Sequence, residues 1–374
     1  MLTFKDFAKK YNDFHVPQYE ILIGSPKNSE SSLKPLNASE YPVLSISVNQ
    51  SIEASSSAQI TFLSSFNYEN SDFEKDYYGA FEIGSKIAIK LGYGVPATVF
   101  VGAIGSVSTN FSPSGITVGV TCYDAKITLF YNTAWKSFTE KSTVDNVVKE
   151  LLKPCEKYGN VSISFAEPKE LPERSWVQDN IDDYHFLMQI ASLTNSSFYT
   201  SGDTVYFVKN VFNEFCEKSG SDADFALGWG AGLMSLSVDI DVSGQIGSVE
   251  IAFRDKSSET GHTKYEGDDI KGKGSLPDDK GDIAKRKAHE KTETLVDTEK
   301  QALAVAKNIF MKSAINYVKG RGQVIGIPDI TVGKSVELTG LGKKLNGIYF
   351  IGQAAHQFDG GGFITSFTCH RPKI

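Results

Sequence analysis

Alternating apolar and polar residues dominate the first 125 positions of the chain. The stretch VLSISVNQ at 43–50 places Leu44, Ile46 and Val48 on one face and polar residues on the other, a period of two that predicts a strand. Four further stretches, separated by Gly, Pro, Ser or Asn, have the same pattern: AQITFLSS, SKIAIKLGYG, ATVFVGAIGSVS and GITVGVTCYDA. So many short strands predict a sandwich or a barrel.

Helical periodicity interrupts this pattern after about residue 135. The stretch STVDNVVKELLKP predicts a helix that Ser142 caps and Pro154 ends, and DDYHFLMQIASLT predicts a second helix capped by Asp182. The following stretch, SSFYTSGDTVYFVKN, predicts two strands around a Ser-Gly-Asp turn. We therefore expect a small α/β domain at 135–220.

The strand pattern resumes in the last third of the chain. Strands are predicted within 233–255 and near 324–325, 335–339, 348–354 and 363–370. The segment 256–296 is rich in Lys, Asp, Glu and Gly, so it is expected to be a loop or a mobile insertion. Residues 297–319 are predicted to form a helix that Asp297 or Thr298 caps and Gly320 ends. The second β region is therefore discontinuous.

These patterns predict an α+β fold that is mainly β. Residues 1–17 are expected to form an N-terminal helix or arm, with Thr3 and Asp6 in a capping box. A first β-barrel is expected at 18–134, and a second at 221–374, with the small α/β domain between them. In the closing hairpin, Gly360, Gly361 and Gly362 are expected to supply positive φ, and one alternating row is expected to face inward: Phe363, Thr365, Phe367 and Cys369.

Charge and composition exclude several classes of function. The net charge of −7 opposes specific nucleic-acid binding and docking on anionic lipid, because both need a concentrated basic surface. The four cysteines are scattered and are expected to be buried, reduced thiols. The chain begins without a secretory h-region and has no long apolar run, so we expect synthesis in the cytoplasm without a signal peptide and no stable membrane anchor.

Candidate chemistry in the sequence is sparse. His185 follows Asp182 and Asp183, which allows an acid–base pair, but acids in a helix's first turn are favoured by the dipole alone. His356 has no nucleophile motif near it, and no phosphate loop or calcium loop has the required spacing. We predict no catalytic, cofactor-binding or metal-binding residues, no cofactor, and a protein that is not an enzyme. The many aromatic residues, such as Tyr77 and Tyr78, fit ordinary barrel packing and an interface equally well.

Three parts of the chain resemble the phage late control protein D family, which includes baseplate hub proteins of contractile tails and the N-terminal part of VgrG-type spike proteins. The end of the chain carries VGKSVELTG, LNGIYFI and a histidine before a glycine-rich turn, after Gly322, Gly326 and Pro328. The α/β segment carries the pattern D-x-x-F-L-x-x-[IL]-A. The first barrel carries a Gly-Tyr-Gly turn, a Phe-x-Gly strand and a Tyr-Asp strand end, at Gly92, Tyr93, Gly94, Phe100, Gly102, Tyr123 and Asp124. The resemblance covers roughly 18–255 and 297–372.

The resemblance implies two tail-tube-like barrels and a homotrimer, in which three chains place six barrels in a ring. It implies a structural baseplate hub that adapts the hexameric inner tube, or a tube-initiator protein, to a trimeric central spike in a phage tail or tail-like injection particle. VgrG-type proteins continue into further domains, so the spike is expected to be a separate polypeptide. The segment 256–296 is expected to contact spike, tube or wedge proteins. A cell-wall hydrolase of the same machine is the alternative, and a carbohydrate-binding module is a weaker one.

Overall fold

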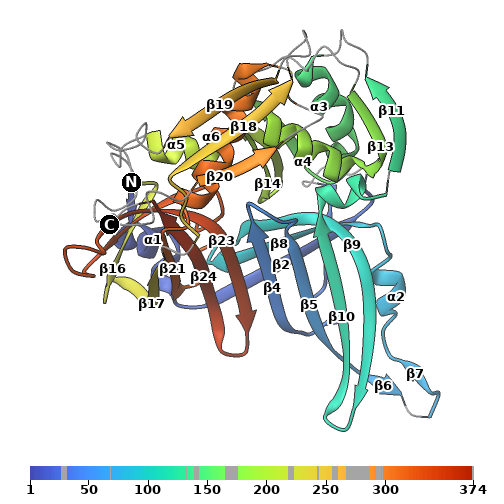
Figure 1. The fold of residues 1–374 in the computed structure, drawn as a ribbon. Coiled ribbons are helices and arrows are strands. Elements are labelled where there is room, and N and C mark those ends of the chain that lie inside the picture. The colour runs from blue at the N-terminus through green and yellow to red at the C-terminus, as the bar shows by residue number, and fades with distance from the viewer. Residues whose placement is uncertain are drawn as a thin grey trace.

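The computed structural model describes residues 1–26, 32–67, 69–131, 133–138, 143–164, 176–217, 223–241, 244–254, 260–266, 287–291, 296 and 298–372. Two β-barrels lie next to each other, and helices with three smaller sheets cover one end of them (Figure 1). The chain therefore has the mainly β α+β fold with two barrels that the sequence predicted, and the second barrel is discontinuous.

The first barrel consists of six strands that are all antiparallel to their neighbours. They follow the spatial order β4-β5-β10-β9-β8-β2, open between β4 and β2. Their apolar rows meet inside, where Val118, Val120 and Cys122 have no exposed surface. The strands are β2 (Pro17–Gly24), β4 (Val43–Ser51), β5 (Ser57–Ser64), β8 (Lys86–Tyr93), β9 (Ala97–Ser112) and β10 (Gly115–Asp124).

The second barrel also has six strands, and their pairing closes a ring. Their order is β17-β21-β24-β23-β22-β16, and β16 pairs with β17 to close it. The inward row predicted for the last strand is confirmed, since Phe363, Thr365, Phe367 and Cys369 are all buried. The strands are β16 (Phe225–Trp229), β17 (Gly232–Ile240), β21 (Val318–Ile325), β22 (Ser335–Thr339), β23 (Gly347–Asp359) and β24 (Gly362–Arg371).

The two barrels repeat one strand order. When the six strands of each barrel are numbered along the chain, both barrels run second, third, sixth, fifth, fourth, first. The register of the paired residues is shared as well.

The hairpin of the fifth and sixth strands matches residue for residue. Cys122 lies opposite Ile104, and Cys369 lies opposite Ile351. The next residue of the fifth strand is left out of the pairing in both barrels: Gly105 in the first and Gly352 in the second. Each glycine is therefore a β-bulge of one residue. The turns match as well, because Ser112 pairs with Gly115 and Asp359 pairs with Gly362.

The turn glycines differ from the prediction in one respect. Gly115 and Gly362 are the glycines of these turns that have positive φ, at 128° and 115°. Gly360 and Gly361 do not, so the prediction of positive φ is wrong for those two. Gly361 instead donates its N–H to the Asp359 carboxylate at 2.8 Å, an Asx-type contact that helps to hold the turn.

The match continues into the neighbouring strands. Ala58 lies opposite Cys122 just as Gly320 lies opposite Cys369. The second strand of each barrel carries a bulge at its start, at Leu44 and at Met234. The barrels therefore share register and both bulges across their second, third, fifth and sixth strands.

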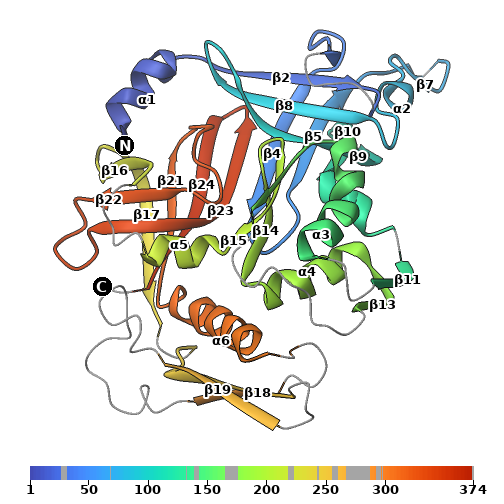
Figure 2. The ribbon, with the colours of Figure 1, turned by 90° about the horizontal axis from the view of Figure 1, so that it is seen from above.

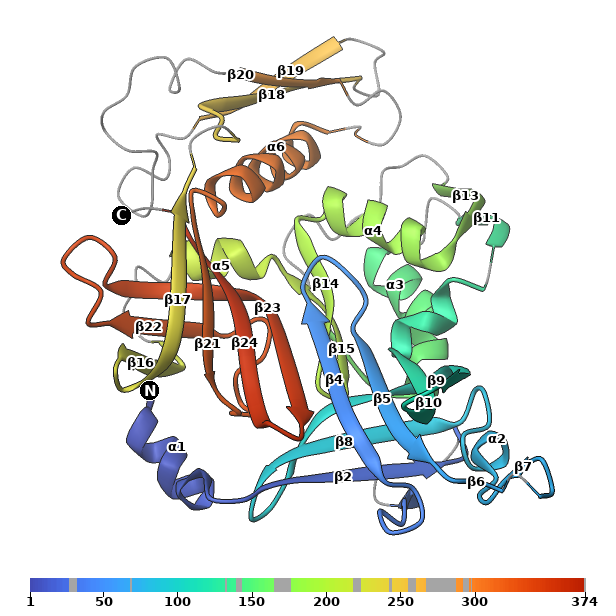
Figure 3. The same ribbon diagram turned by 90° about the horizontal axis from the view of Figure 1, so that it is seen from below.

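One long strand joins the barrels. The first part of β23 pairs with β22, and its later part, Gln353–Asp359, pairs antiparallel with β4 of the first barrel. This joins four strands of each barrel in one sheet, β17-β21-β24-β23-β4-β5-β10-β9, which we call the shared sheet (Figure 3).

A small α/β unit packs on the first barrel. It contains α3 (Val144–Leu152) and α4 (Asp183–Leu193), which Thr143 and Asp182 cap. Asp182 was predicted as a cap, whereas Ser142 lies outside the described residues. The remaining elements are η3 (Ala125–Leu129), β11 (Thr133–Phe138), η4 (Lys153–Lys157), β12 (Asn160–Ser164), β13 (Trp176–Asp182), β14 (Ser196–Ser201), β15 (Thr204–Lys209) and α5 (Val211–Glu217).

The segment after β17 differs from the prediction. Residues 256–296 were expected to be a loop, but β19 (Thr260–Glu266) and β20 (Lys287–Lys291) lie on either side of β18 (Ser248–Arg254). The three-stranded sheet packs on α6 (Glu299–Ala314), away from both barrels (Figure 2). β18 is therefore not a barrel strand. Its row Val249, Ile251 and Phe253 is buried, whereas the polar residues of its partners hide their strand character in the sequence.

Helix α6 is shorter than predicted. Thr298 caps it, as expected, but it ends at Ala314 and not near 319. Residues 318–325 form β21 instead, because they complete pairs with both β17 and β24. Gly320 therefore lies inside a strand, where a Cβ would come within 2.8 Å of the Cys369 sulfur.

The N-terminal arm crosses from the first barrel to the second. β1 (Leu2–Thr3) pairs with β16, and α1 (Phe4–Lys10) begins with the capping box of Thr3 and Asp6. Near its end, the Lys10 ammonium and the Tyr11 hydroxyl lie 2.8 and 2.7 Å from the Asp329 carboxylate. The short elements η1 (Asn12–Phe14), β3 (Lys34–Pro35), β6 (Phe66–Asn67), β7 (Asp72–Phe73) and α2 (Tyr77–Ala80) complete the described fold.

Candidate assembly interface

The first histidine singled out in the sequence is held at a helix start. The Nδ1 atom of His185 lies 2.7 Å from the Asp182 carboxylate, which also accepts the His185 backbone N–H as the cap of α4. The imidazole is 62% exposed, and Asp183 points elsewhere, accepting a hydrogen bond from Gln178. Asp182 is thus occupied by the helix start and Asp183 by Gln178, so the two acids do not act together on the imidazole.

His356 lies inside the second barrel. Its Nδ1 atom lies 3.0 Å from the Thr365 hydroxyl, and the ring has no exposed surface. Burial lowers the pKa of the imidazole to about 4, because a charged ring would lose its hydration. The ring is therefore neutral at physiological pH, and it faces the barrel core and not a substrate-sized opening.

Metal-ligating residues do not gather anywhere in the described part of the chain. No group of three or more His, Cys, Asp or Glu side chains there has the geometry to hold an ion. The four cysteines are buried and free of disulfides, as predicted. Among the described helices, none combines the length and the apolar character needed to cross a bilayer.

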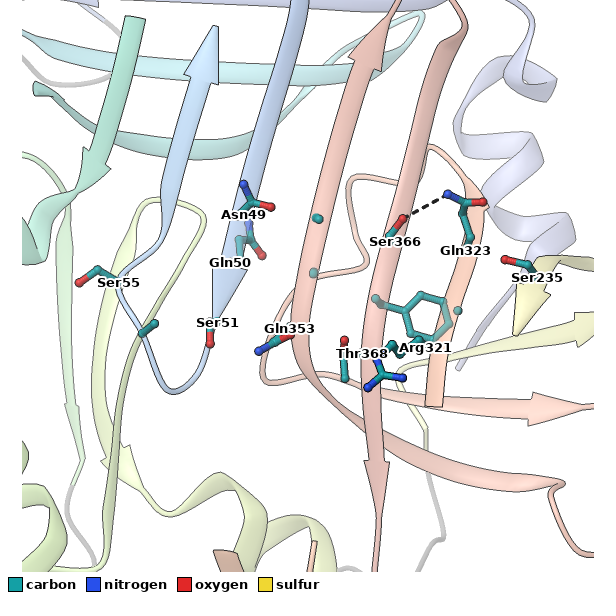
Figure 4. Close-up of a pocket in the computed structure, with 15 residues that line it drawn as sticks. Asn49, Gln50, Ser51, Ser55, Ser235, Arg321, Gln323, Gln353, Ser366 and Thr368 are labelled. Carbon is teal, nitrogen blue, oxygen red and sulfur yellow. Dashed lines mark hydrogen bonds between the residues drawn. The ribbon is translucent and has the colours of Figure 1, made fainter. Parts of the chain in front are cut away.

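A polar hollow of about 550 Å³ lies on the shared sheet where the two barrels meet (Figure 4). Its side chains come from β4 and the loop after it, and from β23, β24, β21 and β17. They are mostly uncharged: Asn49, Gln50, Ser51, Ser55, Ser235, Gln323, Gln353, Ser366 and Thr368, with Arg321. The Gln323 amide donates to the Ser366 hydroxyl at 3.4 Å, and Arg321 pairs with Asp239 at 2.9 Å.

This surface suits contact better than catalysis. Its lining includes no Asp, Glu, His or Cys, so its serines have no neighbouring general base. Amide and hydroxyl side chains instead offer many weak hydrogen bonds without a fixed charge. The hollow is lined by amide, hydroxyl and small apolar side chains with Phe367 and one arginine, and it spans the junction of the two barrels.

A buried ion pair connects the first barrel to the α/β unit. The Lys126 ammonium lies 3.7 Å from the Asp124 carboxylate and donates to the Ala54 carbonyl at 3.1 Å, and neither side chain is exposed. The same ammonium faces the rings of Tyr184 and Phe198 at 5.9 and 5.4 Å. Burial lowers the pKa of Lys126, although the carboxylate opposes that shift. Asp124 also caps the turn that begins at Ala125, so it orders the start of the unit.

Two edges of the shared sheet lack a strand partner within the described chain. Beyond the bulge at Gly105, residues 106–112 of β9 pair only with β10. Residues 234–240 of β17 pair only with β21. Large apolar side chains are exposed on these edges, namely Phe111 at 61%, Met234 at 55% and Ile240 at 49%. Exposed apolar surface on an unpaired strand edge is typical of a site for a protein partner.

Sequence patterns missed these edges because periodicity identifies strands without identifying their neighbours. The strands themselves were found, and so was the final hairpin. A comparison of the chain with itself could have aligned 102–124 with 349–371, which have equal length and share Thr-Cys at Thr121 and Thr368. That signal was available in the sequence.

The family model of the Alg8 N-terminal domain matches residues 35–359 of this chain. That span includes most of both barrels and the whole α/β unit. None of the curated proteins matches the chain by sequence.

Several solved structures share the fold at low sequence identity. The 43 kDa tail protein of prophage MuSo2 from Shewanella oneidensis is 13% identical with a TM-score of 0.67, and the match covers 95% of this chain and 98% of that one. The Escherichia coli c3393 protein, a component of the type VI secretion system, is 10% identical with a TM-score of 0.54, and the match covers 88% and 74%. A chain of the PdpA–VgrG complex is 12% identical with a TM-score of 0.58, and the match covers 96% and 65%. These likenesses confirm the tail-protein fold that the sequence resemblance implied.

Proposed function

This chain belongs to the Alg8 N-terminal domain family. We propose that it is a structural hub of a contractile tail or a tail-like injection particle. In this proposal three copies form a ring that adapts a hexameric inner tube to a trimeric central spike. The fold neighbours are consistent with it, since they include a phage tail protein and a component of a type VI secretion system.

The repeated barrel is the observation that carries the proposal. One chain presents two barrels with the same strand order and, in four strands of each, the same register and bulges, joined side by side in a single sheet. Three such chains would present six nearly equivalent barrels, so a threefold ring could match a sixfold tube. A protein without this repeat would need two different kinds of contact to connect a sixfold tube to a threefold spike.

The proposed partners follow from this role. The spike, and the tube or a tube-initiator protein, would contact opposite faces of the ring. The presence of a PdpA–VgrG complex among the fold neighbours supports a spike-type partner. Contact with wedge proteins through 256–296 stays a prediction, and much of that segment lies outside the described residues.

We propose a non-enzymatic role. The polar hollow lacks a general base, and both singled-out histidines serve local structure. No specific observation favours the hydrolase alternative or the carbohydrate-binding one. The chain would act inside an assembled tail particle after synthesis in the cytoplasm.

Native mass spectrometry of the purified chain tests the proposal. A trimer that co-purifies with the particle's spike protein, and that leaves peptidoglycan intact in a zymogram, is the expected result. A chain that stays monomeric at micromolar concentration and in the presence of the spike would contradict the hub role. Clearing of peptidoglycan that a single Asp or Glu substitution abolishes would favour the hydrolase.

A further inference from the structure

We propose that the free edge of β9 in one copy pairs antiparallel with the free edge of β17 in a second copy, in the register that β23 and β4 use within the chain. The inference deepens the proposed hub function and rests on it. It names the residues through which neighbouring copies meet, which the trimer hypothesis alone does not.

The template is the junction inside the chain. The fifth strand of the second barrel, β23, leaves β22 after Phe350 and continues past the bulge at Gly352 as the partner of β4. In that junction His356 lies opposite Val48, and Gln357 lies opposite Ser47. The fifth strand of one barrel thus pairs with the second strand of the other.

The first barrel ends in the same geometry without the partner. Its fifth strand, β9, leaves β8 after Ala103 and continues past the bulge at Gly105. Gly84 donates its N–H to the Ile104 carbonyl at 2.8 Å, as Gly333 does to the Ile351 carbonyl at 3.0 Å. In both barrels, the fifth strand therefore stops pairing with the fourth strand at the same position. Beyond it, β23 has β4 beside it, whereas the described residues place no strand beside β9.

Burial of the second strands shows the same difference. The inward row of β4 is covered by the junction, with Ile46 and Val48 fully buried and Gln50 only 3% exposed. Their counterparts on β17 are Leu236, Val238 and Ile240, which follow the bulge at Met234 as the β4 row follows Leu44. Leu236 and Val238 are only partly buried, and Ile240 is 49% exposed. The row on β17 is apolar, like the buried row of β4, but no described strand lies beside it.

A second copy is the occupant that both edges fit. Among the described residues, one fifth-strand edge and one second-strand edge stay unpaired, at opposite ends of the shared sheet. Joining the two is a head-to-tail contact that repeats from copy to copy and can close a ring. The internal junction shows that strands of this register and these bulges pair without adjustment.

The correspondence fixes the register. Thr109 takes the place of His356, and Val238 that of Val48, so these two residues are predicted to lie opposite each other across the contact. Asn110 is then opposite Ser237, and Phe111 is opposite Leu236. The side chains of Asn110 and Ser237 are both exposed on the outer face, which makes them suitable for cross-linking.

Cysteine pairs in the full-length chain test the register. Opposed residues of antiparallel strands have Cα atoms about 4.5–5.5 Å apart, within the range of a disulfide. The double variant Asn110→Cys with Ser237→Cys is expected to give a covalent three-chain species after mild oxidation. The four native cysteines are buried and should not compete. The pair Gln357→Cys with Ser47→Cys copies the same geometry inside the chain, so it should form an intramolecular disulfide and serves as the positive control.

The negative control is Asn110→Cys with Val238→Cys, because a shift of one residue places the two side chains on opposite faces of the sheet. A non-covalent trimer whose in-register pair stays reduced, or cross-links no faster than this control, overturns the proposed register and leaves the hub role intact. Covalent chains longer than three copies support the edge pairing and contradict the trimer. Single chains before and after oxidation overturn both.

Discussion

The two barrels agree closely in four of their six strands and differ most in the first. Their second, third, fifth and sixth strands share register and bulges, and these are the eight strands of the shared sheet. The first strands differ, because β2 runs antiparallel to β8, whereas β16 runs parallel to β22 and also pairs with β17. The fourth strands also pair with the fifth in the same register next to the bulge, so the first strands are where the two barrels differ most.

The ends of the sixth strands show a second difference. In the first barrel the strand ends at Asp124, which is buried with Lys126. The matching position in the second barrel is Arg371, which donates to the Asn346 carbonyl at 2.9 Å at the surface. The first barrel carries the α/β unit at this end, and its residue is a buried acid. Among the described residues, the second barrel does not carry such a unit there, and its residue is a basic side chain at the surface.

The largest effect is expected at this pair of positions. Asp124→Asn leaves the Lys126 ammonium buried without a counter-charge, which should lower the free energy of unfolding by about 3–5 kcal/mol. Arg371→Gln removes an exposed hydrogen bond and should cost about 1 kcal/mol or less. Chemical denaturation of both variants measures the two losses in the free energy of unfolding.

The double variant Asp124→Asn with Lys126→Met is the control for charge burial. Replacing a buried ion pair by uncharged residues of similar size is often close to neutral, so much of the lost stability should return. If Asp124→Asn and Arg371→Gln lower the free energy of unfolding equally, the buried pair does not stabilise the contact between the first barrel and the α/β unit.

His356 makes the second barrel the more sensitive one to acid. Its matching position in the first barrel is Thr109, which does not titrate. The folded pKa of about 4 lies below the ordinary 6.5, so the unfolded chain binds the proton more tightly. The stabilisation is complete above about pH 6.5 and is lost as the pH falls towards 4, by about 3 kcal/mol in total.

Unfolding measured at pH 7 and pH 4.5 for the wild type and for His356→Thr isolates this contribution. The variant copies the residue of the first barrel, and its stability should fall less over that interval. The other titrating groups are common to both proteins and cancel in the difference. Equal pH dependence in the two would mean that the ring is not held neutral by the barrel core.

Much of the fold was predictable because burial on one face imposes a period of two or of 3.6. The strands at 43–50 and 363–370 and the caps at Thr3, Asp182 and Thr298 followed from such local patterns. The strands β19 and β20 were missed because their residues are largely polar, and helix α6 was extended too far. In β21, pairing on both sides outweighed the helical pattern.

The candidate interface was less predictable. An edge is a relation between strands, and period-two patterns contain no information about neighbours. Phe111 and Ile240 are exposed because no described strand lies beside the edges that carry them. The bulge glycines Gly105 and Gly352 were equally hidden, since a glycine within a strand pattern has several possible causes.

The bulge glycines should differ modestly in their tolerance of a side chain. A Cβ at Gly105 would lie 2.5 Å from ring carbons of Tyr123, whereas at Gly352 it would lie 2.9 Å from the His370 imidazole. Gly105→Ala should therefore cost about 1–2 kcal/mol, and Gly352→Ala less. Thermal unfolding of the two variants measures the difference. Adding Tyr123→Ala to Gly105→Ala should cost less than the sum of the single changes, and strict additivity would show that the ring is not the obstacle.

The smallest effect on the chain itself is expected at Phe111, and it separates the fold from the assembly. Phe111 is 61% exposed and packs at its edge against the rings of Phe66 and Phe73, so Phe111→Ser should change the free energy of unfolding of the single chain by about 1 kcal/mol or less. The matching change Phe358→Ser should cost more, because that ring packs against Tyr19 in the junction, with 5.1 Å between the centroids.

For the association of copies, the larger effect is expected at Phe111. Phe111→Ser should weaken association of the copies about tenfold or more, a loss of about 1.4 kcal/mol per contact, measured by sedimentation against concentration. Tyr131→Ser, at a position that is 76% exposed but on neither edge, is the matched control and should leave association unchanged. If the two surface variants associate alike, the edge of β9 does not contact a second copy, and the likeness of the two barrels would be a property of the fold without a role in assembly.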